Sequence, residues 1–457
     1  MKYSIRDIIL ESPSGKGEEW LKRQKSLEWS YEINERLAKD EQLEKIFLKR
    51  EGKEKDFLDA FLKLGNTKAL RNFMETCMHC GICIDKCHMF ISTGDINNSP
   101  VGRAELVRRI YKDPRVKNVD LSKIYSYYYQ CTECRRCAVF CPNGIDQSEI
   151  TRNVRNVLTS MGIIPEYVVT TLAQVYRVGN NLGLNEKAIA SVVNFLEDDL
   201  KEETGKELRI PLNSKADFLL IPSSTDLFVN TDTMKGYTKV LNALNKKWTI
   251  SSRATEAANF GLFASEKYLR DFGNFVVDEA ISLGVKTVLW GECGHGWRSA
   301  SNYVRYELAK NGIELMHIHQ FTLKALERGQ LKVDKNKNDD LFNYHDPCNY
   351  ARGGNLVNEP REILKMVVRE TVEAKYTKEE TFCCGAGGGL LADEKNWNEF
   401  RAWAGWPAVY YSWKTGASYM ISPCAIDKAQ FPYVIDYHKV PLKMKGLMDL
   451  VGYALEI

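Results

Sequence analysis

The sequence predicts a protein of mixed class, α+α/β, in which helical segments precede two related α/β halves. Three observations predict this class. The first 70 residues are rich in charge, residues 71–165 hold two runs of four cysteines among helix-forming residues, and after about residue 211 short apolar segments alternate with longer helical ones. We therefore expect a helical arm over 1–70, an all-helical domain over 71–165, a helical linker over 166–210, and α/β halves over 211–335 and 336–457.

Length and composition limit the classes of function. The chain has 457 residues, of which 44% are hydrophobic and 27% charged, enough for several domains with cores. A net charge of +3 gives no electrostatic reason to expect a nucleic-acid partner. The N-terminus has no signal pattern, and no uncharged apolar run approaches the roughly 18–20 residues of a membrane span. We expect a cytoplasmic chain that reaches a membrane only through partner subunits.

The predicted arm holds 15 basic and 14 acidic residues in its first 70 positions. Its apolar residues recur at helical but irregular spacing. Two interpretations stay open, a solvated helical pair packed on the chain's own body and a docking arm for a partner subunit. The apolar residues concerned are Leu27, Ile33, Leu37, Leu43, Phe47, Phe57 and Phe61.

Both cysteine runs have the spacing C-x2-C-x2-C-x3-C, which is typical of bacterial ferredoxins and predicts two [4Fe-4S] cubane clusters. The fourth cysteine of each run usually binds the other cluster. The 43 residues between the runs are too many for a compact hairpin and favour ligands at helix ends, beside helices such as 103–111 and 149–161. The predicted ligand sets are Cys77, Cys80, Cys83 and Cys141 for one cluster, and Cys131, Cys134, Cys137 and Cys87 for the other.

Two zinc sites are the structural alternative, although four-cysteine zinc sites usually space two separate pairs. One residue departs from the ferredoxin pattern. Pro142 follows Cys141, whereas His88 follows Cys87. We expect His88 to pack or hydrogen-bond beside a cluster sulfur rather than to bind iron.

The C-terminal part has the pattern of short strands of a mainly parallel sheet. When strand ends are compared, Ser224 falls opposite Cys348 and Cys293 falls opposite Cys424, which favours two related halves over chance similarity. The first half would have lost most of its thiols. The expected strands are 218–221, 248–251, 287–290, 314–318, 342–345 and 419–422.

Five further cysteines lie in these halves. We expect no disulfide framework in this chain. They are Cys293, Cys348, Cys383, Cys384 and Cys424. Four glycines in five residues follow Cys384 and let the backbone approach a large inorganic cofactor. They miss the last position of a dinucleotide fingerprint. Because the carboxyl ends of parallel strands form the ligand crevice, we expect all five thiols to converge there. A buried reduced pair and a vicinal redox disulfide are the alternatives for Cys383 and Cys384.

The spacing of Cys348, the Cys383-Cys384-Gly385 triplet and Cys424 resembles the CCG module of heterodisulfide reductases and related iron-sulfur subunits. The resemblance covers about residues 70–450. The sequence is most similar to the DsrK/HmeD family, in the segments Cys87-His88, 92–95, 291–298 and 345–350. It implies one noncubane [4Fe-4S] cluster. Ser224 and 259–261 replace ligands of the first half and Asp427 replaces the last cysteine of the second, so Cys293 would supply the missing ligand.

The resemblance also implies a function. Electrons from a membrane quinol-oxidising cytochrome b subunit (DsrM-like), with other complex subunits, would cross the cubanes and cleave the trisulfide of a DsrC-like protein at the noncubane site. His295 is the first candidate proton donor, with Arg298 beside the cluster. Trp297, Asn349 and Arg352 are also expected there.

Two alternatives remain. The D polypeptide of coenzyme M-coenzyme B heterodisulfide reductase has the same domains and acts on a small substrate, for which we expect a closed pocket rather than an open crevice mouth. The iron-sulfur subunits of glycolate and glycerol-3-phosphate oxidation also resemble this layout, and they act as electron relays between a flavoprotein and quinone.

Overall fold

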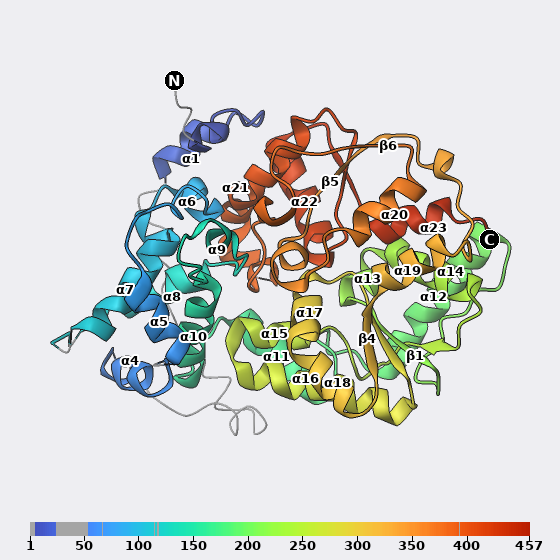
Figure 1. Cartoon of the computed structure of the whole chain (residues 1–457), viewed down its shortest axis with the longest axis horizontal. Helices are drawn as coiled ribbons and strands as arrows, with labels where there is room; N and C mark the ends of the chain where they lie inside the picture. Colours follow the sequence, from blue (N-terminus) through green and yellow to red (C-terminus); the bar gives the residue numbers. More distant parts are fainter. Residues whose placement is uncertain (1–4, 24–53, 66, 114, 117, 393) are drawn as a thin grey trace.

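The computed structural model describes residues 5–457 except 24–53, 66, 114, 117 and 393. The helical region with the two cysteine runs lies at one end of the molecule, and the two α/β halves extend from it to the other end (Figure 1). The predicted α+α/β class is confirmed. None of the described helices combines the length and the apolar character needed to cross a bilayer.

The described parts of the N-terminal arm pack on the chain's own body. The arm contains η1 (Ile5–Ile9), α1 (Gly17–Arg23), α4 (Glu54–Ala60) and the π-helical turn η2 (Phe61–Gly65). Trp20 stacks on Trp403 at 5.7 Å between ring centroids, and Trp406 Nε1 donates a hydrogen bond to the Ile8 carbonyl (2.7 Å). Leu27, Ile33, Leu37, Leu43 and Phe47 lie outside the described residues, so the docking-arm interpretation stays open for them.

The region of the two cysteine runs, predicted as an all-helical domain over 71–165, is helical and has no strand in its described part. Its elements are α5 (Lys68–Thr76), α6 (His88–Thr93), η3 (Ile96–Asn98), α7 (Pro100–Lys112), α8 (Leu121–Tyr129), α9 (Arg136–Phe140) and α10 (Gln147–Ser160). Cys77 ends α5, Cys87 begins α6 and Cys141 ends α9. These cysteines therefore lie at helix ends, as the spacing between the runs predicts.

The next two helices, α11 (Glu166–Val178) and α12 (Glu186–Thr204), are not a free connection. Leu172 of α11 shares a buried cluster with Leu219 and Ile221 of the first sheet. Leu200 of α12 shares another with Leu220, which points to the opposite face of that sheet. The prediction of a linker over 166–210 is wrong in this respect, because the apolar faces of both helices are buried on the first half.

The first half has a parallel sheet in the order β2-β1-β3-β4. Its strands are β1 (Phe218–Ile221), β2 (Trp248–Thr249), β3 (Thr287–Trp290) and β4 (Glu314–His317). β2 is shorter than predicted because the ladder ends at Thr249, and Ile250 forms only a single bridge to Leu212. The helices are α13 (Ser224–Phe228), α14 (Thr231–Ala243), α15 (Ala258–Ala264), α16 (Glu266–Leu283), α17 (Gly294–Ser299), η4 (Ala300–Val304), α18 (Arg305–Lys310) and α19 (Ile318–Glu327).

The second half repeats this topology with the order β6-β5-β7-β8, again all parallel. Its strands are β5 (Leu341–Tyr344), β6 (Glu370–Val372), β7 (Tyr419–Ile421) and β8 (Lys443–Lys445). The sequence did not predict β6 and β8. The helices are η5 (Lys335–Lys337), η6 (Tyr350–Gly354), α20 (Glu359–Val367), η7 (Lys378–Glu380), η8 (Leu390–Ala392), α21 (Glu394–Trp413), α22 (Ala425–His438) and α23 (Leu447–Ala454).

The identical strand order confirms the two related halves. Cys293 and Cys424 occupy equivalent positions, each at the N-cap of the helix that follows the third strand of its half, with similar backbone angles. The halves join where α14 crosses α23. A Cβ on Gly236 would lie 2.1 Å from the Met448 carbonyl oxygen, so only glycine allows this crossing.

Candidate functional site

The first predicted ligand set surrounds one cavity, which we call the outer site. Cys77, Cys80, Cys83 and Cys141 all line it. Cys80 is exposed to solvent, and the neighbouring Met78 is 75% exposed. That these cysteines bind a cluster stays a prediction, but the structure brings all four to one place near the surface.

The second predicted set surrounds a separate cavity, the inner site. Cys87, Cys131, Cys134 and Cys137 line it, and Cys137 also lines the outer site. The shared cysteine means that the two sites are neighbours. Such an arrangement suits electron transfer from one cluster to the other.

Buried cations around the inner site provide a test of whether an iron-sulfur cluster fits there. Arg103 and Arg136 are each 1% exposed and line the cavity, yet within the described part of the chain neither pairs with a carboxylate. A buried charge requires a counter-charge. Clusters held by four thiolates are anionic, so the inner site has both the ligands and the countercharge that a cubane needs.

The five remaining cysteines, Cys293, Cys348, Cys383, Cys384 and Cys424, form what we call the five-cysteine site. All five are buried, with exposures of 0–7%. Hydrogen bonds from the thiols of Cys134, Cys348 and Cys384 lower the pKa of Cys383 well below its usual range. Cys348 and Cys384 therefore both lie in contact with Cys383.

Cys293 and Cys424 join this group across the boundary between the halves. A Cβ on Gly294 would lie 3.2 Å from Cys424 Sγ and 3.4 Å from the Asn349 Cβ. Asn349 Nδ2 in turn donates to Cys348 Sγ (3.6 Å). The convergence that the sequence predicts for these cysteines is thus seen in the structure, while their binding to iron stays a prediction.

The sequence did not predict how close the inner site is to the five-cysteine site. Cys134 lines the inner cavity and also donates to Cys383. A ring nitrogen of His88 lies within 4.8 Å of both sulfurs. That ring bonds Thr132 Oγ1 (2.9 Å) and the Ala404 carbonyl (3.2 Å), the packing and hydrogen-bonding role expected of His88.

The glycines after Cys384 explain this proximity. Gly385 has a φ of +86°, and a Cβ there would lie 2.5 Å from the backbone nitrogen of Gly405 in α21. Gly388 has a φ of +66°, and its Cβ would lie 2.8 Å from the Cys131 carbonyl oxygen. In the structure these two glycines therefore permit a close approach between protein segments, including the loop of the inner site, where the sequence suggested an approach to a cofactor.

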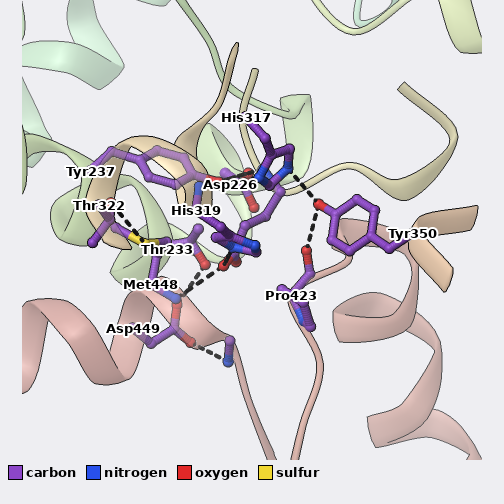
Figure 2. Close-up of polar contacts among 12 residues, drawn as sticks. Asp226, Thr233, Tyr237, His317, His319, Thr322, Tyr350, Pro423, Met448 and Asp449 are labelled. Carbon is purple, nitrogen blue, oxygen red and sulfur yellow. Dashed lines mark hydrogen bonds and ion pairs between the residues drawn. The ribbon is translucent and has the colours of Figure 1, made fainter. Parts of the chain in front are cut away.

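A buried polar network holds Cys293 and Cys424 in place. The backbone nitrogen of Ala425 donates to the Glu292 carbonyl (2.7 Å), which ties the two cysteine-bearing loops together. The Glu292 carboxylate bonds Lys428 Nζ (3.0 Å) and His319 Nε2 (2.9 Å). Figure 2 shows how side chains of both halves converge here, with Asp226 and His319 from the first and Asp449 and Tyr350 from the second.

Lys428 is the cation at the centre of this network, 5% exposed and paired with Asp226 (2.9 Å) and Glu292 (3.0 Å). We expect Lys428→Met to lower the free energy of unfolding by about 3–5 kcal/mol, because it leaves the buried carboxylates of Asp226 and Glu292 without the lysine that balances their charge. Guanidinium-induced unfolding of the full chain measures this. Lys443→Met, at an exposed position of β8, provides the control. Equal unfolding midpoints for the two methionine variants would contradict the expectation.

His295 is buried near the five-cysteine site, and Gly388 N contacts its Nε2 (3.5 Å). Burial, followed by the charge of Arg298, lowers the pKa of His295 to about 3. The role of His295 as the proton donor that the sequence suggested stays a prediction.

The other candidate residues hold the cysteine loops. Arg298 donates to the Glu133 carbonyl (3.0 Å) and to Asn349 Oδ1 (3.2 Å). Arg352 donates to the carbonyls of Cys134 and Thr381, the latter at 2.8 Å. Trp297 is buried, and its Nε1 donates to the Gly354 carbonyl (2.8 Å). The two arginines thus bind the segments of the inner and five-cysteine sites together.

The positions that depart from the full ligand pattern carry polar side chains. Ser224 Oγ donates to the Glu256 carboxylate (2.9 Å), and Asn259 Nδ2 donates to Cys293 Sγ (3.6 Å). Asp427 accepts from Ser422 Oγ (2.8 Å) and contacts Cys384; burial raises the pKa of its carboxyl to about 7. Glu256 is a buried residue of the site that sequence reasoning missed, since no motif marks it.

Comparison with known proteins identifies two domains. A family model described as a 4Fe-4S dicluster domain matches residues 73–145, and one described as a cysteine-rich domain, CCG, matches residues 342–431. The Hdr-like menaquinol oxidoreductase iron-sulfur subunit 2 of Archaeoglobus fulgidus is 35% identical over 87% of this chain and 83% of its own length. The corresponding iron-sulfur subunit of Archaeoglobus profundus is 34% identical, over 87% and 82%. The D polypeptide of the dihydromethanophenazine:CoB–CoM heterodisulfide reductase of Methanosarcina barkeri is 22% identical, over 84% and 94%.

Proposed function

Because this chain belongs to the family of Hdr-like menaquinol oxidoreductase iron-sulfur subunits, and is thus an electron-transfer subunit of an oxidoreductase, we propose that it reduces a sulfur–sulfur bond at the five-cysteine site. Electrons come from quinol through a membrane cytochrome b subunit (DsrM-like) within a complex that includes further subunits. The chain itself is peripheral, on the cytoplasmic face of the membrane.

The observation that carries the proposal is that each of the three cysteine sites adjoins the next. The outer site is near the surface, the inner site shares Cys137 with it, and Cys134 of the inner site contacts Cys383. This order supports a path for electrons from a partner at the outer site, through two [4Fe-4S] cubanes, to a noncubane [4Fe-4S] site.

The five cysteines would hold a four-iron cluster, which would supply the one-electron chemistry needed to cleave a sulfur–sulfur bond. The protein supplies the surroundings. Burial of all five thiols excludes water, and Asn349 directs Cys348 by a hydrogen bond. Arg298 and Arg352 fix the loops that carry the ligands, so that the ligands keep their spacing during turnover.

We propose the trisulfide of a DsrC-like protein as the substrate, as the DsrK/HmeD resemblance implies. A small heterodisulfide is the second candidate, and the burial of the site favours it. Cys348 is the most exposed of the five cysteines, at 7%. The open crevice mouth expected for a protein substrate is therefore not seen, and such a substrate would have to open it. In the third possibility, an electron relay, the chain cleaves no sulfur–sulfur bond.

The experiment that separates these functions uses the anaerobic full chain with a reduced low-potential dye as the electron source. Dye oxidation is measured with a DsrC-type trisulfide and with the coenzyme M-coenzyme B heterodisulfide. We expect oxidation with the trisulfide at two electrons per bond. Oxidation with the heterodisulfide alone would transfer the assignment to the small substrate. No oxidation with either, from a chain that holds all its iron, would leave only the relay.

A further inference from the structure

The inner and outer sites differ in charge. The described lining of the outer site includes no Asp, Glu, Lys or Arg side chain. The inner site is lined by Arg103, Arg135 and Arg136 and by the carboxylate of Glu133. Two sites with the same kind of ligand set thus lie in different electrostatic environments.

Two of these charges have nearby partners. Arg135 Nε lies 2.7 Å from Asp146 Oδ2, and Glu133 Oε1 lies 3.2 Å from Nη1 of the buried Arg155. Arg136 donates instead to the carbonyls of Lys86 (2.7 Å) and Glu380 (2.9 Å). Together with Arg103, it remains as positive charge without a carboxylate partner in the described part of the chain.

Arg103 is directed at a predicted cluster ligand. It is on α7, and its Nη1 lies 3.9 Å from Cys87 Sγ. Its Nε donates to the Tyr127 carbonyl (2.7 Å), and another of its nitrogens donates to Asn98 Oδ1. These neutral partners fix the guanidinium without cancelling its charge.

We propose that Arg103 and Arg136 raise the reduction potential of the inner cluster, so that an electron received at the outer cluster passes inward and is held beside the five-cysteine site. This inference rests on the proposed function. In this step the outer cluster is oxidised by one electron and the inner cluster is reduced by one. The guanidinium groups keep their charge, so no proton has to move.

The physical reason is the charge of the cluster. Reduction adds a negative charge to a group that is already anionic, and burial opposes it because water is absent. Fixed positive charges at short range act in the opposite direction, and a buried site screens them little. Cleavage of a sulfur–sulfur bond takes two electrons, so a stored first electron shortens the wait for the second.

The test is a redox titration of the two cubanes by electron paramagnetic resonance in the full chain, purified anaerobically. Cys80→Ser assigns the outer signal, because Cys80 lines only the outer site. We expect Arg103→Met to lower the midpoint potential of the inner cluster and to leave the outer one unchanged. Arg103→Lys, which keeps the charge, should shift it less. Arg109→Met removes an exposed charge from the same helix and should shift neither.

An unchanged inner potential in Arg103→Met, or an equal shift in the lysine and methionine variants, would overturn the inference. If Arg103→Met loses the inner cluster, two measurements decide instead: the inner midpoint potential of Arg136→Met, and the order of the inner and outer midpoint potentials in the wild type. An inner potential below the outer one in the wild type would then overturn it. Dye oxidation by the wild type with a sulfur–sulfur substrate tests the proposed function separately, and that result does not depend on the order of the potentials.

Discussion

Cys424→Ala is expected to reduce the iron content of the anaerobic protein from about 12 to about 8 per chain, a loss of one four-iron cluster. Sulfur–sulfur cleavage should fall to background. Cys424 is buried at the start of α22 and lies near Asp427 and Gly294, away from the cavities of the cubane sites. Its loss should therefore leave the signals of both cubanes intact.

Ser224→Ala is the matched control. Ser224 occupies the place in the first half that Cys348 occupies in the second, and it bonds Glu256 rather than a predicted ligand. We expect this variant to retain about 12 irons. Equal iron in the wild type and in Cys424→Ala would contradict the assignment of Cys424 as a ligand.

Gly385→Ala is expected to cost about 3 kcal/mol or more in the free energy of unfolding, from strain at a left-handed residue and from overpacking. The new Cβ would lie 2.5 Å from Gly405 N and 2.8 Å from the Ala404 carbonyl carbon, both of them backbone atoms inside α21. Because Gly385 follows Cys384 directly, the shift should also displace the five-cysteine site. Guanidinium-induced unfolding measures the first effect and iron content the second.

Gly416→Ala separates strain from overpacking. Gly416 has a φ of +78°, but a Cβ there has no atom within 4 Å. We expect a loss of only about 1–2 kcal/mol, the cost of the left-handed conformation. If both alanine variants unfold at the same midpoint, the close approach of Gly385 to α21 contributes nothing.

Local sequence patterns predicted most of the fold. The cysteine runs predicted a helical two-site domain, and apolar segments predicted five strands almost to the residue. β6 and β8 were missed because their sequences, Glu370–Val372 and Lys443–Lys445, are short and polar. Both are edge strands, where one side has no neighbour and an apolar run is not required.

Features that depend on distant contacts could not be predicted. Lys428 lies 202 positions from Asp226 and 136 from Glu292, so no motif joins them. The docking of Trp20 on Trp403 and the contact of Cys134 with Cys383 have the same character. The burial of His295 could not be predicted either, because only the structure shows that its ring is enclosed.

The measurement that tests the central claim most directly is the iron content of the anaerobically purified wild-type chain. Two cubanes and a further cluster at the five-cysteine site predict about 12 irons per chain. A value of about 8, from protein shown to have lost none during purification, would contradict that claim. The five-cysteine site would then bind no cluster, and the chain would be an electron relay.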